Sequence, residues 1–286
     1  MSFRTVVIKS HSKLEYSLGY LVVRSDQITR ILVKEIKTLI VQNTGVSLTA
    51  ALLSELVGSK VTVMFCDSKS NPQFELYPYF GNHSVASKFK EQICWNVETM
   101  NEIWQSIIRA KIINQSKNLS SNERISLQEY ARDTKVGDVT NREGHAAKVY
   151  FRQLFGPEFS RHSSSCYQNA YLDFGYTIIL SAFNRCIVAA GYLTHFGIHH
   201  IGETNPFNLS CDLMEPLRPL VDRTALSPNV NDDNFKTLMI NLLEKTVIFN
   251  KQEMYLENAI EKYVRTVLNA LKDNNPQAVD FIEYEL

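Results

Sequence analysis

The hydrophobic residues of the chain change their spacing near His83, and this change constrains the fold more than any other feature. Before it, short runs rich in β-branched residues are separated by polar or turn residues, which is typical of strands. After it, apolar residues recur every three or four positions, as a long amphipathic helix requires. The sequence therefore predicts an α+β protein of two domains, a small N-terminal β-rich domain followed by a larger all-helical domain.

The first domain is expected to contain several short strands and one helix. Ser47 or Thr49 can cap this helix, and Gly58 ends it. The strands are expected at the β-branched runs 5–8, 20–23, 28–33, 39–41 and 61–65.

A turn-rich segment marks the domain boundary. Residues 67–81 contain Pro72, Pro78 and Gly81, so we place the domains at residues 1–75 and 76–286. In the second domain, helices are expected at 93–112, 143–154, 169–190, 212–222, 234–249 and 255–271.

The composition excludes several classes of protein. The chain has 286 residues, of which 44% are apolar and 21% charged, so it is globular rather than disordered. Its five cysteines are scattered without a Cys-x-x-Cys pair, so we expect neither a disulfide framework nor a zinc knuckle, and a cytoplasmic location. The most apolar stretch, 176–193, contains Asn184 and Arg185, which predicts a buried helix and no membrane contact.

The charge of the chain is balanced overall but unevenly distributed. Thirty Lys and Arg face thirty Asp and Glu, yet the first 142 residues have a surplus of five positive charges and the rest an equal negative surplus. This is either scatter or a mildly basic half that can meet phosphates. The last residues, 280–286, alternate charged and apolar side chains, which suits an added edge strand, a docking tail or a frayed terminus.

Three segments of the chain contain side chains able to bind a hard metal ion. The first contains Glu143, and the second contains three histidines. Glu143 stands at an expected helix start, where a carboxylate is otherwise simply favourable with the helix dipole. His195, His199 and His200 lie within six positions after a long apolar helix. Neutral imidazole binds metals and transfers protons near neutral pH, although loop histidines are often only solvated.

The third segment places two acids three residues apart. Pro216 fits only the first turn of a helix, so a helix is expected to begin near Asp212, with Asp212 and Glu215 on one face. A solvated capping pair is the ordinary interpretation. Pro219 is expected to kink or end the first turns.

The order of these motifs and the identities of their residues resemble those of one known family. Glu143-Gly144-x-Ala146-Ala147-x-x-Tyr150-Phe151 resembles the first catalytic motif of the CRISPR-associated spacer-acquisition integrases, the metal-dependent DNA nuclease-integrase subunits of the adaptation complex. Gly197-Ile198-His199-His200 matches the Gly-x-x-His that this family places after a long apolar helix. Residues 212–219 match its Asp-Leu-x-Glu-x-x-Arg-Pro. The resemblance spans nearly the whole chain and is greatest for the type II form.

The resemblance implies that Glu143, His200 and Glu215 ligate a divalent metal ion, Mg²⁺ or Mn²⁺, with Asp212 as a further ligand or an orienting acid. Two carboxylates and an imidazole suit such an ion. Two departures from the family pattern stand out. Many members have Asp in place of Glu215, and an apolar residue is commoner at the position of His199. The spacing of the motif selects His200.

The resemblance also implies a function. Family members are DNA endonucleases and integrases of CRISPR adaptation, in which a prespacer 3′-hydroxyl attacks a phosphodiester at the leader–repeat junction by transesterification. The implied partners are double-stranded DNA (prespacer and CRISPR repeat), a second copy in a homodimer, and a smaller dimeric CRISPR-associated protein in a four-plus-two complex. The β-rich domain is expected to serve dimerisation or DNA contact, and the acidic half is a candidate face for the smaller protein.

Basic residues near the first motif are the preferred candidates for contact with DNA phosphates, Arg142 and Lys148 above all. Tyr150 is expected in the core rather than as a base-stacking platform, and Arg218 in a structural salt bridge rather than paired with an acid of the site. The remaining basic candidates are Arg4, Lys9, Lys13, Arg24, Arg30, Arg109, Lys111 and Arg132.

Two alternatives compete with the enzyme hypothesis. One is a non-catalytic DNA-binding scaffold of the same complex, in which a partner performs the chemistry. The other is an unrelated helical metal-binding protein whose acids and histidines coincide by chance.

Overall fold

A computed structural model of the chain describes residues 4–76, 78, 84–161 and 166–285. The chain divides into two compact units, Met1–His83 and Ser84–Leu286. The division falls eight residues beyond the boundary expected at residue 75. Gly81, one of the residues that suggested a linker, lies outside the described residues.

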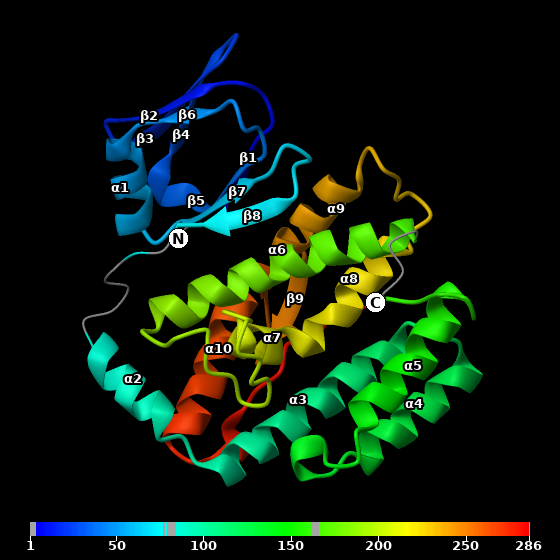
Figure 1. The fold of residues 1–286 in the computed structure, drawn as a ribbon. Helices are drawn as coiled ribbons and strands as arrows, with labels where there is room; N and C mark the ends of the chain where they lie inside the picture. The colour runs from blue at the N-terminus through cyan, green and yellow to red at the C-terminus, as the bar shows by residue number, and fades with distance from the viewer. Residues whose placement is uncertain (1–3, 77, 79–83, 162–165, 286) are drawn as a thin grey trace. The chain divides into compact units, whose positions relative to one another are not determined.

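The first unit contains two four-stranded sheets (Figure 1). In one, three parallel strands and an antiparallel edge strand follow the order β1 (Arg4–Ile8), β5 (Ile36–Val41), β7 (Thr62–Cys66), β8 (Pro72–Glu75). The other follows the order β4 (Ile28–Leu32), β3 (Tyr20–Arg24), β2 (Lys13–Ser17), β6 (Ser47–Leu48). The short turn η1 (Val33–Glu35) leads from β4 to β5.

Apolar side chains of both sheets and of helix α1 (Ala50–Gly58) form the core of this unit, among them Leu14, Leu39 and Leu52. Thr49 caps α1 by accepting a hydrogen bond from the Leu52 N–H at 3.3 Å, as predicted. All five predicted strands are present, and the β-rich fold of this part of the chain is confirmed.

The second unit is mostly helical. Helices α3, α4 and α5 contact one another, and α6 packs against α7, α8, α9 and α10 (Figure 1). The helices are α2 (Val85–Ile93), α3 (Val97–Lys117), α4 (Ser121–Asp133), α5 (Arg142–Phe155), α6 (Tyr167–Ala189), α7 (Asn208–Met214), α8 (Arg218–Ala225), α9 (Phe235–Asn241) and α10 (Leu256–Lys272). Short 3₁₀ turns are η2 (Val136–Asp138), η3 (Glu215–Leu217), η4 (Leu242–Glu244) and η5 (Pro276–Ala278).

Helix α6 is long and apolar enough to cross a membrane by length and composition alone, but 67% of its most apolar window is buried inside the protein. Asn184, near its middle, is itself buried. The helix contacts four other helices of its unit, as the central helix of a folded domain does. The prediction of a buried helix here is confirmed.

One predicted helix is wrong in its second half. In the segment expected as a helix over 234–249, helix α9 ends at Asn241 and η4 follows. The chain then forms strand β9 (Thr246–Phe249), which pairs with β10 (Gln252–Tyr255). Residues 246–249 are β-branched or aromatic and alternate between exposed and buried, which favours a strand. Asn250 and Lys251 both have positive φ, as a tight hairpin turn requires.

The C-terminal segment belongs to the core of the second unit. Glu283 pairs with Ile248 of β9, so the chain end adds an edge to the hairpin. Ile282 and Tyr284 are buried, and the Tyr284 hydroxyl donates a hydrogen bond to the Pro216 carbonyl at 2.6 Å. The chain end therefore pairs with the hairpin through one bridged residue, short of a full edge strand, and the interpretation as a frayed end is wrong. Docking of this segment to a partner stays a prediction.

Candidate metal site

Glu143 lies in the first turn of α5, and two side chains fix the backbone of that turn. The Asp138 carboxylate accepts hydrogen bonds from the N–H groups of Arg142 at 2.8 Å and Glu143 at 2.9 Å. The Asn141 side chain caps the helix by accepting from the Gly144 N–H. These contacts satisfy N–H groups that have no partner inside the helix, so the main chain at Glu143 is held in place.

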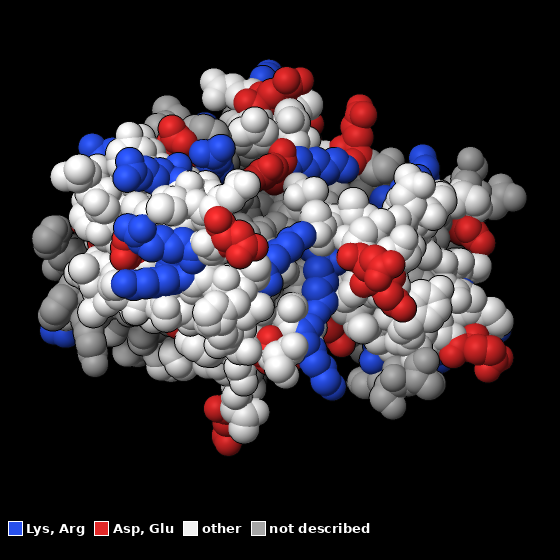
Figure 2. Space-filling view, turned by 90° about the horizontal axis from the view of Figure 1, so that it is seen from above, with Lys and Arg blue, Asp and Glu red and all other residues white. Residues whose placement is uncertain are grey.

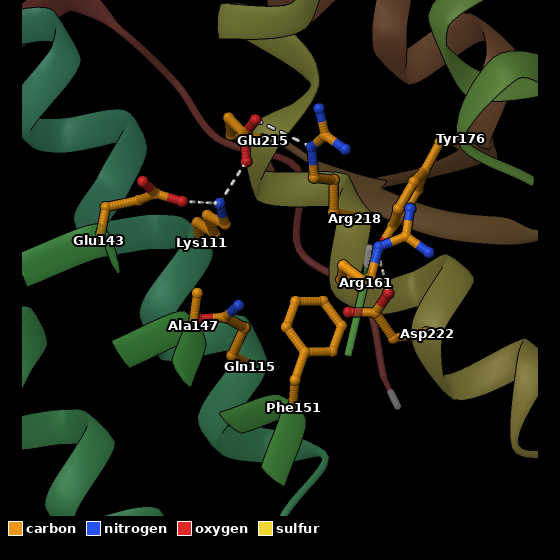
Figure 3. Close-up of a pocket in the computed structure, with 10 residues that line it drawn as sticks. All are labelled: Lys111, Gln115, Glu143, Ala147, Phe151, Arg161, Tyr176, Glu215, Arg218 and Asp222. Atoms are coloured by element: carbon orange, nitrogen blue, oxygen red, sulfur yellow. Dashed lines mark hydrogen bonds and ion pairs between the residues drawn. The ribbon is translucent and has the colours of Figure 1, made fainter. Parts of the chain in front are cut away.

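Glu143 and Glu215 meet around a lysine from a third element (Figure 3). The ammonium of Lys111, on α3, lies 2.5 Å from Glu143 Oε1 and 2.5 Å from Glu215 Oε2. The Lys111 and Glu215 side chains are only 8% and 6% exposed, whereas Glu143 is 34% exposed. Two carboxylates far apart in the sequence therefore face one cation at the wall of a pocket.

Arg218 balances the charge on the other side of Glu215. Its Nε donates to Glu215 Oε1 at 2.8 Å, so Arg218 pairs with an acid of the candidate site, the alternative to the purely structural salt bridge that was expected. Burial would raise the pKa of Glu215, but Arg218 and Lys111 hold it below its ordinary value. Burial would likewise lower the pKa of Lys111, but Glu215 and Glu143 raise it. The pair therefore stays ionised at neutral pH.

Asp212 organises the loop that carries the histidines. Its carboxylate is fully buried and accepts hydrogen bonds from the N–H groups of Ile198 at 2.6 Å and His199 at 2.9 Å. It also contacts both the N–H and the ring Nδ1 of His200. The bond to Asp212 raises the pKa of His200. Both oxygens of Asp212 are thus engaged in orienting the loop, and Nε2 of His200 remains available for a ligand.

The helix expected to begin near Asp212 begins earlier, and the prediction of its start is wrong. Helix α7 starts at Asn208 and ends at Met214, η3 follows with Pro216 in its first turn, and α8 begins with Pro219 in its first turn. Each proline opens a new helical segment, where its missing N–H is not needed. This break lets Asp212 contact the histidine loop while Glu215 contacts Lys111.

The histidine loop has room only for glycine at position 197. A Cβ at Gly197 would lie 2.4 Å from the His200 carbonyl oxygen and 2.6 Å from Asp212 Oδ2. We expect Gly197→Ala to displace His200 and to lower Mn²⁺ affinity by about 10–100-fold, the range seen when outer contacts of a metal ligand are lost. Gly202→Ala, whose Cβ would meet nothing closer than 3.5 Å, is the matched control in the same loop. Equal Mn²⁺ affinities of the two variants would contradict this explanation.

Trp104 of α3 distinguishes the two adjacent histidines. Its ring stacks on His199 at a centroid distance of 4.3 Å and an angle of 6°, and meets His200 edge-on at 5.8 Å. His199 is therefore held by stacking, whereas His200 is held by Asp212. This difference supports the choice of His200 as the ligand, which stays a prediction.

The donor atoms of the site suit a hard divalent ion. The Lys111 ammonium shows that Glu143 and Glu215 can face one cation together. His200 lies outside this pair: the described part of the chain contains no group of three or more His, Cys, Asp or Glu side chains placed to share one metal ion. Two of the three predicted ligands thus fit as they stand, and the third is on the adjoining loop.

The pocket beside these acids has a volume of about 250 Å³ and extends to Asp222 (Figure 3). Asp222 is buried and accepts hydrogen bonds from the hydroxyls of Tyr150, at 2.9 Å, and Tyr176. Burial raises the pKa of Asp222 to about 6. Tyr150 is fully buried, as expected of a core residue. Arg161 lies over the Tyr176 ring, so this end of the pocket is polar and aromatic.

The basic candidates have different surroundings. Arg142 is half-buried with its guanidinium 5.8 Å from the Tyr130 ring centre, whereas Lys148 is exposed. Arg109 donates to the Thr134 carbonyl, and Lys111 is buried among acids, so neither fits the prediction of a phosphate contact. On the face in Figure 2, basic and acidic side chains are interspersed. Contact of Arg142 and Lys148 with DNA stays a prediction.

The sequence interpretation missed three contributors to the site: Asp138, Trp104 and the ion-pairing role of Lys111. Lys111 did carry a signal, because it lies within the apolar stripe of α3, between Ile108 and Ile112. A charged residue at such a position is buried only when it is paired. Asp138 acts locally, on N–H groups four and five residues later, whereas Trp104 contacts a segment far along the chain, which no local pattern marks.

The sequence of the chain is similar to those of a known family. Residues 5–254 match the sequence family described as CRISPR associated protein Cas1. A relative from Neisseria meningitidis serogroup C, named CRISPR-associated endonuclease Cas1, is 29% identical over 308 residues that cover 100% of this chain and 99% of the relative. A relative from Pyrobaculum aerophilum, named CRISPR-associated endonuclease Cas1 1, is 26% identical and covers 76% of this chain and 79% of its own length.

Solved structures share the fold. A casposase bound to integration product superposes with a TM-score of 0.76 at 18% identity, over 96% of this chain and 91% of that one. A Cas1 protein from Thermotoga maritima gives 0.74 at 18% identity, over 94% and 97%. A Cas6-RT-Cas1–Cas2 complex gives 0.75 at 19% identity, over 99% of this chain and 36% of that one. With the family match across most of its length, the chain belongs to the Cas1 family of CRISPR-associated proteins.

Proposed function

We propose that this protein is a metal-dependent DNA endonuclease and integrase of CRISPR adaptation, which joins prespacer 3′-hydroxyl ends to the CRISPR repeat by transesterification. One observation carries the proposal: Glu143 and Glu215, on separate elements, face a single cation in an open pocket. A non-catalytic scaffold would have no use for this arrangement. Family membership already excludes an unrelated metal-binding protein.

The proposed partners follow from the relatives. The Neisseria and Pyrobaculum proteins are named endonucleases, and one structure with this fold belongs to a complex that contains Cas2. We assign to this chain double-stranded DNA as substrate, a homodimer, and a smaller Cas2-type dimer in a four-plus-two complex. The negative surplus of residues 143–286 supports an interface with the smaller protein on a part of this region away from the proposed catalytic pocket, which must itself meet DNA.

The residues of the site have distinct roles in this proposal. Glu143, Glu215 and His200 would hold Mg²⁺ or Mn²⁺, which when bound polarises a phosphoryl oxygen and favours the alkoxide form of the attacking hydroxyl. Arg218 keeps Glu215 ionised. Asp212 orients His200 through its Nδ1. Asp138 holds the first turn of α5, and with it the main chain at Glu143.

Removal of divalent metal tests this function. We expect the protein, supplied with its smaller partner, a repeat-bearing supercoiled plasmid and a short duplex donor, to join strands in Mn²⁺ or Mg²⁺. Excess EDTA should abolish joining, and added Mn²⁺ should restore it, because the carboxylates then regain the ion that offsets transition-state charge. The readout is covalent donor–plasmid product on a denaturing gel.

A gel-shift assay in EDTA is the control for this test. If the protein still binds DNA in EDTA while joining stops, the metal is required for the chemical step and not for DNA binding. Joining that continues in EDTA would contradict metal dependence. A complex that binds DNA and partner but joins no strands in either metal would favour the scaffold alternative.

A further inference from the structure

We propose that Lys111 is the resident cation of the metal-free site, and that a divalent ion displaces its ammonium from Glu143 and Glu215 toward Gln115. The inference rests on the proposed function, because it presumes that the two carboxylates bind a metal. It goes beyond that function by assigning the residue that controls how tightly the metal binds.

Lys111 and a divalent ion compete for the same carboxylate oxygens. The Lys111 ammonium lies 2.5 Å from both Glu143 Oε1 and Glu215 Oε2. A Mg²⁺ ion uses carboxylate oxygens at about 2.0–2.1 Å, so it would draw on the lone pairs that the ammonium now engages. A divalent ion and an ammonium held at the same oxygens also repel each other strongly where water is scarce, and Lys111 is only 8% exposed. The two cations therefore exclude each other.

A site that held neither cation would be destabilised. Glu215 is 6% exposed and has Arg218 as its other basic partner. Without Lys111 and without metal, two carboxylates would face each other with a single arginine to offset them, which is unfavourable for buried charges. Lys111 thus stabilises the metal-free fold and, for the same reason, weakens metal binding.

Gln115 offers the Lys111 ammonium a second position. Gln115 stands four residues after Lys111 on α3, so their side chains are neighbours on the helix surface. Gln115 Oε1 is buried and has no hydrogen-bond partner among the described residues, and both side chains line the same pocket (Figure 3). A buried carbonyl oxygen without a donor is unfavourable, and the flexible lysine stem can bring one.

The test measures Mn²⁺ binding to the full-length protein by electron paramagnetic resonance of free Mn²⁺. We expect Lys111→Met to bind Mn²⁺ at least about tenfold more tightly than wild type, since the competing cation is gone. Gln115→Leu should bind Mn²⁺ about threefold more weakly, because the displaced ammonium then has no acceptor. Lys262→Met, which removes an exposed lysine of α10, should leave the affinity unchanged.

Thermal unfolding gives a readout independent of affinity. Metal-free Lys111→Met should unfold at a lower temperature than wild type, and Mn²⁺ should raise its unfolding temperature by more than it raises that of wild type. If Lys111→Met does not fold without metal, wild type and Gln115→Leu still decide the question. Mn²⁺ affinity that is unchanged in Gln115→Leu, or that is equal or weaker in folded Lys111→Met, would contradict the role of Lys111. Either result would leave the proposed metal site standing. Wild type that binds no Mn²⁺ would overturn the proposed metal site as well.

Discussion

Glu143→Gln should lower the rate of strand joining by about a thousandfold, equivalent to ~4 kcal/mol of transition-state stabilisation. The substitution keeps the size of the side chain and removes one of the two carboxylates that face the shared cation. Because the Glu143 side chain is 34% exposed and its main chain is held by Asp138, the fold should survive the change. The measurement is the initial rate of donor–plasmid joining in Mn²⁺ with the partner present.

Glu129→Gln is the matched control for this prediction. Glu129 lies on the neighbouring helix α4, is 61% exposed and lies 4.0 Å from the Arg132 guanidinium. Its substitution should leave joining unchanged. If the Glu143→Gln protein is folded, binds DNA and joins strands at more than a tenth of the wild-type rate, Glu143 is not a residue of the catalytic site.

Asp212→Asn should lower strand joining by about 10–100-fold, as loss of an outer contact to a metal ligand does. Asp212 is fully buried and accepts from consecutive backbone N–H groups and from the His200 ring. An asparagine has the same shape but turns one acceptor into a donor, so at least one of these N–H groups loses its partner. We expect the free energy of unfolding to fall by about 1–3 kcal/mol for the same reason.

Two measurements separate the effect on the site from the effect on stability. Metal affinity should fall in Asp212→Asn even at temperatures where circular dichroism shows a fully folded protein. Asp133→Asn, at the exposed end of α4, is the control and should change neither quantity. If Asp212→Asn joined strands like wild type, the orienting role of Asp212 would be refuted.

The sequence predicted most of the fold because its periodicity is strong. The β-branched runs of the first unit and the three- and four-residue spacing of α3 are local signals, and both gave elements that the structure contains. Strand β2 was not among the predicted strands. Its sequence, Lys-Leu-Glu-Tyr-Ser, is too polar to be recognised as a strand from the sequence alone. It is stabilised by pairing with β3, which is a tertiary effect.

The site was predictable only in part, for a different reason. Glu143, His200, Asp212 and Glu215 were found because their motifs match a family pattern, and the structure joins Glu143 with Glu215 and Asp212 with His200. How these two pairs connect to their surroundings depends on contacts between distant segments, such as Lys111 with both acids. Periodicity and short motifs do not record such contacts.

The most direct test of the central claim is the position of a bound metal ion. Crystals of the protein grown with Mn²⁺ should show one anomalous-scattering peak between the carboxylates of Glu143 and Glu215, with a ring nitrogen of His200 as a third ligand. A Mn²⁺-bound protein whose anomalous peaks all lie away from these three side chains would contradict the claim.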